Sequence, residues 1–196
     1  ASHLILAPIL EACLAAYPGL MLDVTVHYEP RALHGGRFDA GIRIGYKVAK
    51  DMEVLQVSRP TRLIAVASPD YLSRVSVPNV PEDLHHHSCI RFHKFGKPVD
   101  WLFEKGKRKL EISVNGPLVA DSMDFIIEAT LDGIGIGFAI EDFIQDHIAA
   151  GRLVPILRDW SPAIHSYYLY YSGCGQIPAP LKALIEFFQN REAKSK

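Results

Sequence analysis

Few of the features that mark specialised protein classes occur in this chain of 196 residues. Its apolar runs are short and broken by proline, glycine or charge, and none approaches the ~20 residues that a membrane-spanning helix needs. The three cysteines, Cys13, Cys89 and Cys174, are odd in number and lack CxxC spacing, which argues against a disulfide framework and indicates reduced thiols. No basic segment followed by an apolar run and a cleavage site marks a signal peptide. We therefore expect a cytoplasmic protein with no membrane partner.

A surplus of charge of one sign is also missing. Lys and Arg number 21 against 22 Asp and Glu, so the formal net charge is −1. The one basic cluster, at residues 105–109, falls where a hairpin is expected and is interpreted as a solvated turn. Proteins that bind nucleic acid carry a basic stripe or patch that neutralises phosphates. We therefore predict that this chain does not bind DNA by itself.

Catalytic motifs are absent as well, with no GxSxG elbow, no P-loop and no HExxH in the sequence. The segment GIGIG, residues 133–137, closes a predicted helix and opens a strand, which is the reverse of a dinucleotide fingerprint. Its small residues indicate that a backbone or a ligand comes close to the strand. His85, His86 and His87 are adjacent, so their side chains diverge, and they are interpreted as a capping or solvated loop. We expect no catalytic residues, no cofactor and no metal site.

The sequence that remains has the pattern of an α/β protein. Apolar residues at helical spacing predict a helix over residues 4–17, and alternation predicts a strand over 20–27. A second turn or helix and strand follow, at 31–37 and 38–44, and this order implies parallel pairing through βαβ crossovers. Further strands are expected at 53–58, 61–67, 88–92, 101–104, 109–114, 118–120, 134–140, 152–157 and 166–171. Further helices are expected to begin at Ser68, Ser122, Glu141 and Pro178.

The first predicted helix is apolar on every face, because Glu11 is its only ionisable residue. A helix of this kind must be covered on more than one side. In a domain of this size, one cover is a second subunit, and the alternative is a fully buried central helix.

Polar residues at helix starts and strand ends are the candidate binding groups. A helix start offers free N–H groups and partial positive charge, which suit a carboxylate or another anion. Ser2 and His3, Ser68, and Ser122 precede predicted helices. Tyr28 and Arg43 stand at the ends of predicted strands, where open α/β sheets bind ligands. For each residue taken singly, ordinary capping or surface polarity is the alternative.

Four short motifs, in a fixed order, resemble those of one family. They are FDAGIR at residues 38–43, ASPDYL at 67–72, GIGIG at 133–137 and GRLV at 151–154. In series they are similar to the C-terminal effector-binding domain of LysR-type transcriptional regulators, and the resemblance covers nearly the whole chain. The winged helix-turn-helix that precedes this domain in the family has no counterpart in the sequence.

The resemblance implies an α/β type-2 periplasmic-binding-protein fold, with two Rossmann-like lobes joined by two crossover strands. By analogy, lobe I comprises residues 1–67 and 165–196, and lobe II comprises residues 68–164. A small-molecule effector would bind in the cleft between the lobes, and a carboxylate is the expected class. The family's homodimer would pack the first helix of one subunit against lobe II of the other. DNA would be contacted only through the absent N-terminal domain.

Carried over residue by residue, the resemblance implies that seven residues of this chain line the cleft. Arg43 or the helix starts would hold a carboxylate, while Tyr28 and Phe138 would contact apolar parts of the effector. The family normally begins this domain with a strand before the first helix, whereas this chain opens almost at that helix. The implied set is Ser2, His3, Tyr28, Arg43, Ser68, Ser122 and Phe138.

Two other classes of protein share such a fold. A solute-binding protein of a transporter is exported and usually monomeric, and the absent signal sequence, the odd cysteine count and the apolar first helix disfavour it. An enzyme on the same fold would need a nucleophile–base pair or a metal set, and the sequence shows neither. Sensing by a transcriptional regulator is the preferred interpretation.

Overall fold

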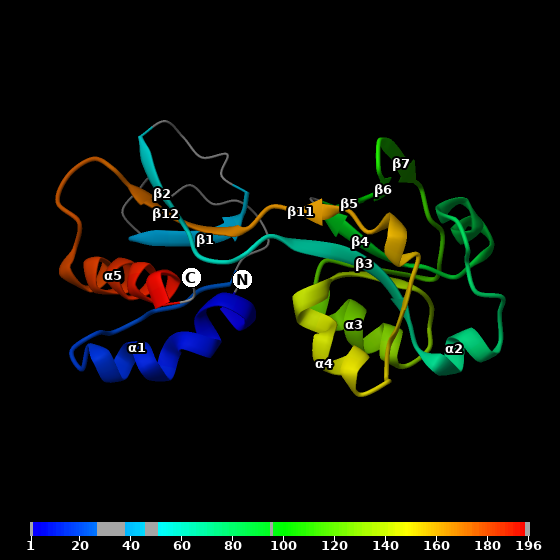
Figure 1. Cartoon of the computed structure of the whole chain (residues 1–196), viewed down its shortest axis with the longest axis horizontal. Helices are drawn as coiled ribbons and strands as arrows, with labels where there is room; N and C mark the ends of the chain where they lie inside the picture. Colours follow the sequence, from blue (N-terminus) through cyan, green and yellow to red (C-terminus); the bar gives the residue numbers. More distant parts are fainter. Residues whose placement is uncertain (1, 27–37, 46–50, 95, 195–196) are drawn as a thin grey trace. The chain divides into compact units, whose positions relative to one another are not determined.

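The computed structural model describes residues 2–26, 38–45, 51–94 and 96–194. The chain divides into two compact units, Ala1–Pro60 with His165–Lys196 (unit 1) and Thr61–Ile164 (unit 2) (Figure 1). The sequence interpretation placed the first boundary at residue 67. The structure assigns strand β3, Thr61–Ala67, to unit 2, because β3 pairs with three later strands of that unit.

Unit 1 is built on a three-stranded antiparallel sheet in the order β1–β12–β2. Its strands are β1 (Ala40–Ile44), β2 (Met52–Gln56) and β12 (Tyr167–Ser172). The parallel pairing predicted here is wrong for the described strands, because β12 returns from the far end of the chain and lies between the other two. Residues 20–26 form no strand either, and the side chain of Met21 is 87% exposed.

The helices of unit 1 pack on one face of this sheet (Figure 1). They are η1 (Ser2–Leu6), η2 (Ala7–Ile9), α1 (Leu10–Ala16) and α5 (Ala179–Lys194). The single helix predicted over residues 4–17 is thus divided, with Pro8 inside the 3-10 turn, where its missing N–H disfavours a continuous α-helix. Cys13 is buried, whereas Leu14 is 41% exposed. The first helix is therefore not a fully buried central helix in this chain.

Unit 2 contains a sheet in which β3 pairs antiparallel with β9 (Gly137–Ile140), β10 (Val154–Ile156) and β11 (Ala163–Ile164). A second group places β4 (Ile90–Lys94) between β8 (Leu118–Ala120), which is parallel to it, and β5 (Lys97–Pro98), which is antiparallel. A parallel bridge from Cys89 to Ile136 joins the two groups. Strands β6 (Trp101–Lys105) and β7 (Arg108–Ile112) form a separate hairpin.

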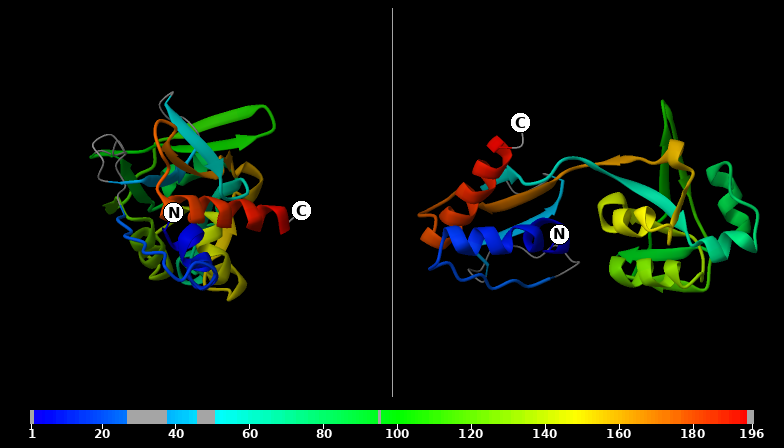
Figure 2. Two further views of the ribbon diagram at one scale, coloured as in Figure 1. Left: turned by 90° about the vertical axis from the view of Figure 1, so that its left-hand side faces the viewer. Right: turned by 60° about the horizontal axis from the view of Figure 1, so that its bottom comes forward.

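Helices α3 and α4 lie together on one side of the strands of unit 2, and the β6–β7 hairpin lies on the other (Figures 1 and 2). The helical elements are α2 (Pro69–Ser73), η3 (Pro81–His86), α3 (Met123–Leu131), α4 (Glu141–Ala149) and η4 (Arg158–Trp160). Gly133 and Gly151 follow α3 and α4 with φ of +72° and +68°, which confirms the predicted helix ends. Among the described helices, none combines the length and the apolar character needed to cross a membrane.

Candidate functional site

Ser122 stands where two parallel strands of unit 2 end. Phe92 of β4 lies opposite Ala120 of β8, so the residues after them share one edge of the sheet. Ser122 then begins α3, and its hydroxyl oxygen accepts a hydrogen bond of 3.4 Å from the Phe125 N–H, which confirms the predicted cap. The carboxyl end of parallel strands beside a helix start is a common ligand position in α/β proteins.

The charges around Ser122 do not favour an anion. Asp121 is exposed directly before the helix, and Asp124 lies in its first turn. Both carboxylates interact favourably with the positive end of the helix dipole and reduce its attraction for a bound carboxylate. The ring of Phe125 is 54% exposed at the same end. This helix start therefore offers a hydroxyl and an aromatic surface, but not a positive site.

Ser68 has the same kind of position but a different environment. It is 2% exposed, and its hydroxyl oxygen accepts a hydrogen bond of 3.2 Å from the Tyr71 N–H at the start of α2. A Cβ added at Gly133 would lie 3.3 Å from the same oxygen, so Ser68 is next to the carboxyl end of α3. With a rise of ~1.5 Å per residue, the two ends of this nine-residue helix lie ~13 Å apart. Ser68 and Ser122 therefore do not converge on one small ligand.

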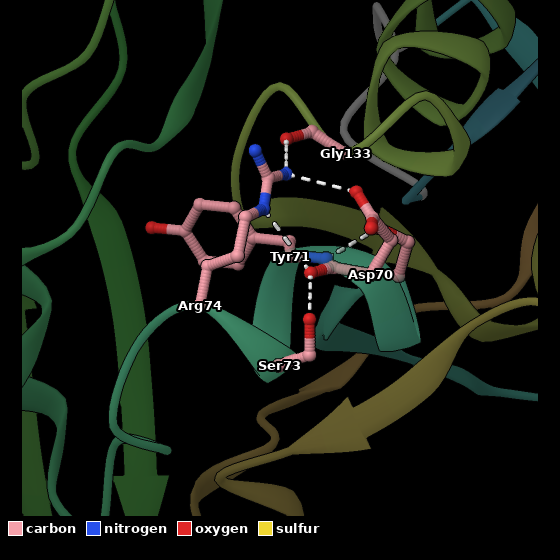
Figure 3. Close-up of polar contacts among 6 residues, drawn as sticks. Asp70, Tyr71, Ser73, Arg74 and Gly133 are labelled. Atoms are coloured by element: carbon pink, nitrogen blue, oxygen red, sulfur yellow. Dashed lines mark hydrogen bonds and ion pairs between the residues drawn. The ribbon is translucent and has the colours of Figure 1, made fainter.

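Arg74 fixes α2 to this end of α3, as Figure 3 shows. One guanidinium nitrogen donates both to Asp70 Oδ2 and to the Gly133 carbonyl oxygen, each at 3.0 Å. Arg74 Nε donates to the Asp70 carbonyl oxygen at 3.2 Å, and the Ser73 hydroxyl donates to the same oxygen at 2.8 Å. The polar groups around Ser68 thus hold α2 against the end of α3.

Phe138 belongs to the hydrophobic core of unit 2. Its ring is 8% exposed and stacks on Trp101 with a centroid distance of 4.9 Å and an interplanar angle of 17°. Phe103 contacts it from a second direction, with a centroid distance of 5.1 Å. The ring is therefore already covered by aromatic side chains of the same unit.

Arg43 is the cation among the predicted site residues. It lies on β1 opposite Tyr168 of β12, and its Cζ is 5.7 Å from the ring centroid of Tyr170. The side chain is partly buried. Within the described part of the chain it makes no hydrogen bond and no ion pair, so its N–H donors are open to an anion.

The structure describes the other predicted residues less fully. Ser2 and His3 lie in the π-helical turn η1, at the start of the chain, and Tyr28 lies outside the described residues. The structure thus places Arg43 in unit 1 and Ser68, Ser122 and Phe138 in unit 2.

The glycine-rich segment has a structural explanation. A Cβ added at Gly135 would lie 2.5 Å from the carbonyl oxygen of Ser88, and one at Gly137 would overlap the Thr130 hydroxyl. The Ile136 N–H donates a backbone hydrogen bond of 2.8 Å to the Ser88 carbonyl oxygen at this contact. The close approach predicted from these small residues is therefore made by the protein's own backbone and a helix side chain.

The consecutive histidines form part of a capped turn. Asp83 accepts hydrogen bonds from the N–H groups of Asn79 and Val80 at 2.8 and 3.1 Å, and these bonds hold the pKa of its carboxyl below the ordinary value. His87 Nδ1 lies 3.4 Å from the Tyr71 hydroxyl, and burial lowers its pKa. His85 and His86 are exposed. Among the described residues, no group of three His, Cys, Asp or Glu side chains is arranged to hold a metal ion.

The two buried thiols are poor nucleophiles. Burial raises the pKa of Cys89 to about 12 and also raises the pKa of Cys13. Reactivity in cysteines depends on the thiolate, which these environments disfavour. The structure thus assigns them a packing role.

Two residues beside the predicted site were not identified from the sequence. Tyr170 contacts Arg43, and Phe125 is exposed beside Ser122. The alternation of strand residues 167–171 was a usable signal for Tyr170, because it places Tyr168 and Tyr170 on one face. Phe125 lies three residues after the N-cap Ser122, and a search for capping residues alone does not consider that position.

Comparison with known proteins gives one consistent result. Residues 1–193 match the family model of the LysR substrate binding domain. The chain is 34% identical over 183 residues to a transcriptional regulator of Pseudomonas aeruginosa, a match that covers 92% of this chain and 60% of the relative. It is 32% identical over 188 residues to the HTH-type transcriptional regulator YcaN of Escherichia coli, covering 95% and 61%. The chain thus spans about three fifths of the length of these relatives.

Solved structures show the same fold. The regulatory domain of AphB in Vibrio vulnificus superposes with a TM-score of 0.85 over 97% of this chain and 93% of that chain, at 24% sequence identity. This likeness shows the periplasmic-binding-protein-like fold that the sequence motifs predicted.

Proposed function

Since this chain belongs to the LysR substrate-binding domain family, we propose that it is the sensing part of a longer transcriptional regulator and that it binds a small-molecule effector. The relatives are named as transcriptional regulators, which favours this function over a solute-binding protein of a transporter and over an enzyme. DNA would be contacted by a segment of the regulator outside this chain.

One observation carries the choice of effector class. Arg43 is a partly buried cation whose side chain has no hydrogen-bond or ion-pair partner among the described residues. Exposed arginines of the chain, such as Arg108 and Arg158, are by contrast paired with the carboxylates of Glu82 and Glu141. A buried or half-buried charge is stabilised when it gains a hydrogen-bonded partner. We assign a carboxylate of the effector to this position.

The rest of the proposed site follows from which side chains remain available. In unit 2, the Ser122 hydroxyl and the exposed ring of Phe125 beside it are the proposed contacts for a neutral or apolar group. In unit 1, Ser2, His3 and Tyr28 remain candidates on the ground of the family resemblance alone. We leave out Ser68 because its hydroxyl caps α2, and we leave out Phe138 because its ring is stacked on Trp101.

The effector would act by shifting a conformational equilibrium. A ligand that binds one arrangement of the regulator better than another moves the population toward it, by as much as its affinities differ. That shift would change how subunits assemble on DNA.

We further propose that the domain forms a homodimer through the first helix, whose residues Ala12, Leu14 and Ala15 are exposed, against unit 2 of the partner.

A thermal-shift screen with a metabolite library rich in carboxylates and aromatic acids tests the proposal. A ligand at 100 times its dissociation constant adds ~2.7 kcal/mol, which raises the melting temperature by roughly 5–10 °C. Light scattering in parallel reports the oligomeric state. A stabilising acid whose amide does not stabilise would support the proposal. A library in which no compound stabilises the chain at millimolar concentration would contradict it.

A further inference from the structure

One face of the sheet of unit 1 is turned away from the packed helices. The opposite face carries Ile42 and Leu169, which join the core with α1 and α5. Directly paired residues of an antiparallel sheet share a face. Gly41 pairs with Tyr170, and Arg43 pairs with Tyr168, so these four residues lie together on the face without those helices.

Gly41 allows the Tyr170 ring to lie across β1. A Cβ added at Gly41 would lie 2.8 Å from Tyr170 Cε1 and would overlap the Cζ and hydroxyl atoms. An ordinary strand residue at position 41 would therefore displace the ring. This close approach gives the glycine of the FDAGIR segment a specific packing role.

The position of the Tyr170 ring matters because the same ring contacts Arg43. The guanidinium carbon lies 5.7 Å from the ring centroid, within the range of a cation–π interaction. Such a contact restrains the long side chain without using its N–H groups. No residue in the described part of the chain accepts a hydrogen bond from this guanidinium, so its five donors can serve a ligand, in a planar arrangement that matches a carboxylate.

We infer that Tyr170 is a positioning residue for Arg43, and that Gly41, Tyr170 and Arg43 together form the carboxylate-recognition element of unit 1. The inference rests on the proposed function, which assigns the effector's carboxylate to Arg43. Tyr170 holds the guanidinium in place before the ligand arrives, so less side-chain freedom is lost on binding. The Tyr170 hydroxyl is not required, because the ring face makes the contact.

The arrangement itself can be tested without a ligand. Protons held over an aromatic ring resonate upfield, so the Arg43 Nε–H signal of the full chain should be shifted in a nitrogen–proton correlation spectrum. Tyr170→Phe should retain the shift, whereas Tyr170→Leu and Gly41→Ala should lose it. A wild-type Arg43 signal at the random-coil position, or one unchanged in Tyr170→Leu, would overturn the inference whatever the effector is.

Benzoate, with benzamide as its neutral counterpart, tests the binding role. Titration should move the Arg43 signal with benzoate and not with benzamide. The benzoate affinity should fall roughly three- to fivefold in Tyr170→Leu and stay near wild type in Tyr170→Phe. Arg152→Gln, which changes an exposed arginine on unit 2, is the matched control. Equal benzoate affinity in wild type and Tyr170→Leu would overturn the positioning role. A wild-type signal that does not respond to benzoate would instead contradict the carboxylate assignment to Arg43.

Discussion

Arg74 and Gly133, 59 positions apart in the chain, are joined by a hydrogen bond of 3.0 Å from guanidinium to backbone carbonyl. Gly133 directly follows the C-cap of α3, where unpaired carbonyl groups and partial negative charge accumulate. A cation that donates to these carbonyls stabilises the helix end. Through this bond, the short helix α2 is attached to the longer α3.

Replacing Arg74 by Ala should therefore lower the free energy of unfolding by about 1 kcal/mol, since a charge-assisted hydrogen bond at a helix end is lost. The ion pair with Asp70 adds little, because both side chains are more than half exposed. Urea denaturation measures the change. Arg152→Ala is the matched control, with an expected change within about 0.5 kcal/mol. Equal stability of Arg74→Ala and wild type would show that the bond is not maintained in solution.

Gly135→Ala should lower the free energy of unfolding more than Arg74→Ala does, because the new methyl group would lie 2.5 Å from the carbonyl oxygen of Ser88. Backbone atoms cannot move aside as a flexible side chain can, so the loss should be about 1–3 kcal/mol. Gly19→Ala is the control, since nothing lies within 4 Å of the added atom. Thermal melting of both variants decides the matter, and a loss in Gly19→Ala equal to that in Gly135→Ala would contradict the account.

His87 should make stability depend on pH. Burial holds its pKa in the folded chain below the ordinary value of 6.5, although the charge of Asp83 opposes the shift. The unfolded chain therefore binds more protons as the pH falls through 6.5, so stability decreases below that pH until the folded pKa is passed. Urea midpoints between about pH 5 and 7.5 should show this decrease in wild type and in His85→Asn, and a weaker one in His87→Asn. The same slope in all three would exclude His87 as its source.

The proposed dimer can be tested at Leu14. This side chain is 41% exposed on α1, so Leu14→Glu should leave the fold intact while it places a charge in the subunit contact. Light scattering should show a dimer for wild type and a monomer for the variant. Met21→Glu, at a position 87% exposed, is the control and should remain a dimer. A monomeric wild type, or a dimeric Leu14→Glu, would remove the first helix from the interface.

Local signals in the sequence predicted local structure well. Gly133 and Gly151 marked the ends of α3 and α4, and Ser68 and Ser122 marked the starts of α2 and α3, because capping depends on a few neighbouring residues. The order of strands in unit 1 was not predicted, since β12 comes from more than a hundred residues away to pair with β1 and β2. Propensity and periodicity carry no information about such long-range pairing.

For the candidate site, too, the sequence predicted local features but not the contacts made by packing. Ser68 and Ser122 look alike in sequence, but only packing shows that they stand at opposite ends of α3. Phe138 has the sequence context of a strand near a ligand, yet its ring is stacked on Trp101. Arg43 was identified because its charge and its position at a strand end are both visible in the sequence. Its contact with Tyr170 depends on strand register, which the sequence did not give.

The central claim is that this domain senses an anionic effector through Arg43. Calorimetric titration of the most stabilising acid from the screen into wild type, Arg43→Gln and Arg152→Gln tests it most directly. A hydrogen-bonded charge contributes roughly 1.5–3 kcal/mol, so Arg43→Gln should bind at least about tenfold more weakly, while Arg152→Gln should match wild type. An effector that binds Arg43→Gln as tightly as wild type would contradict the claim.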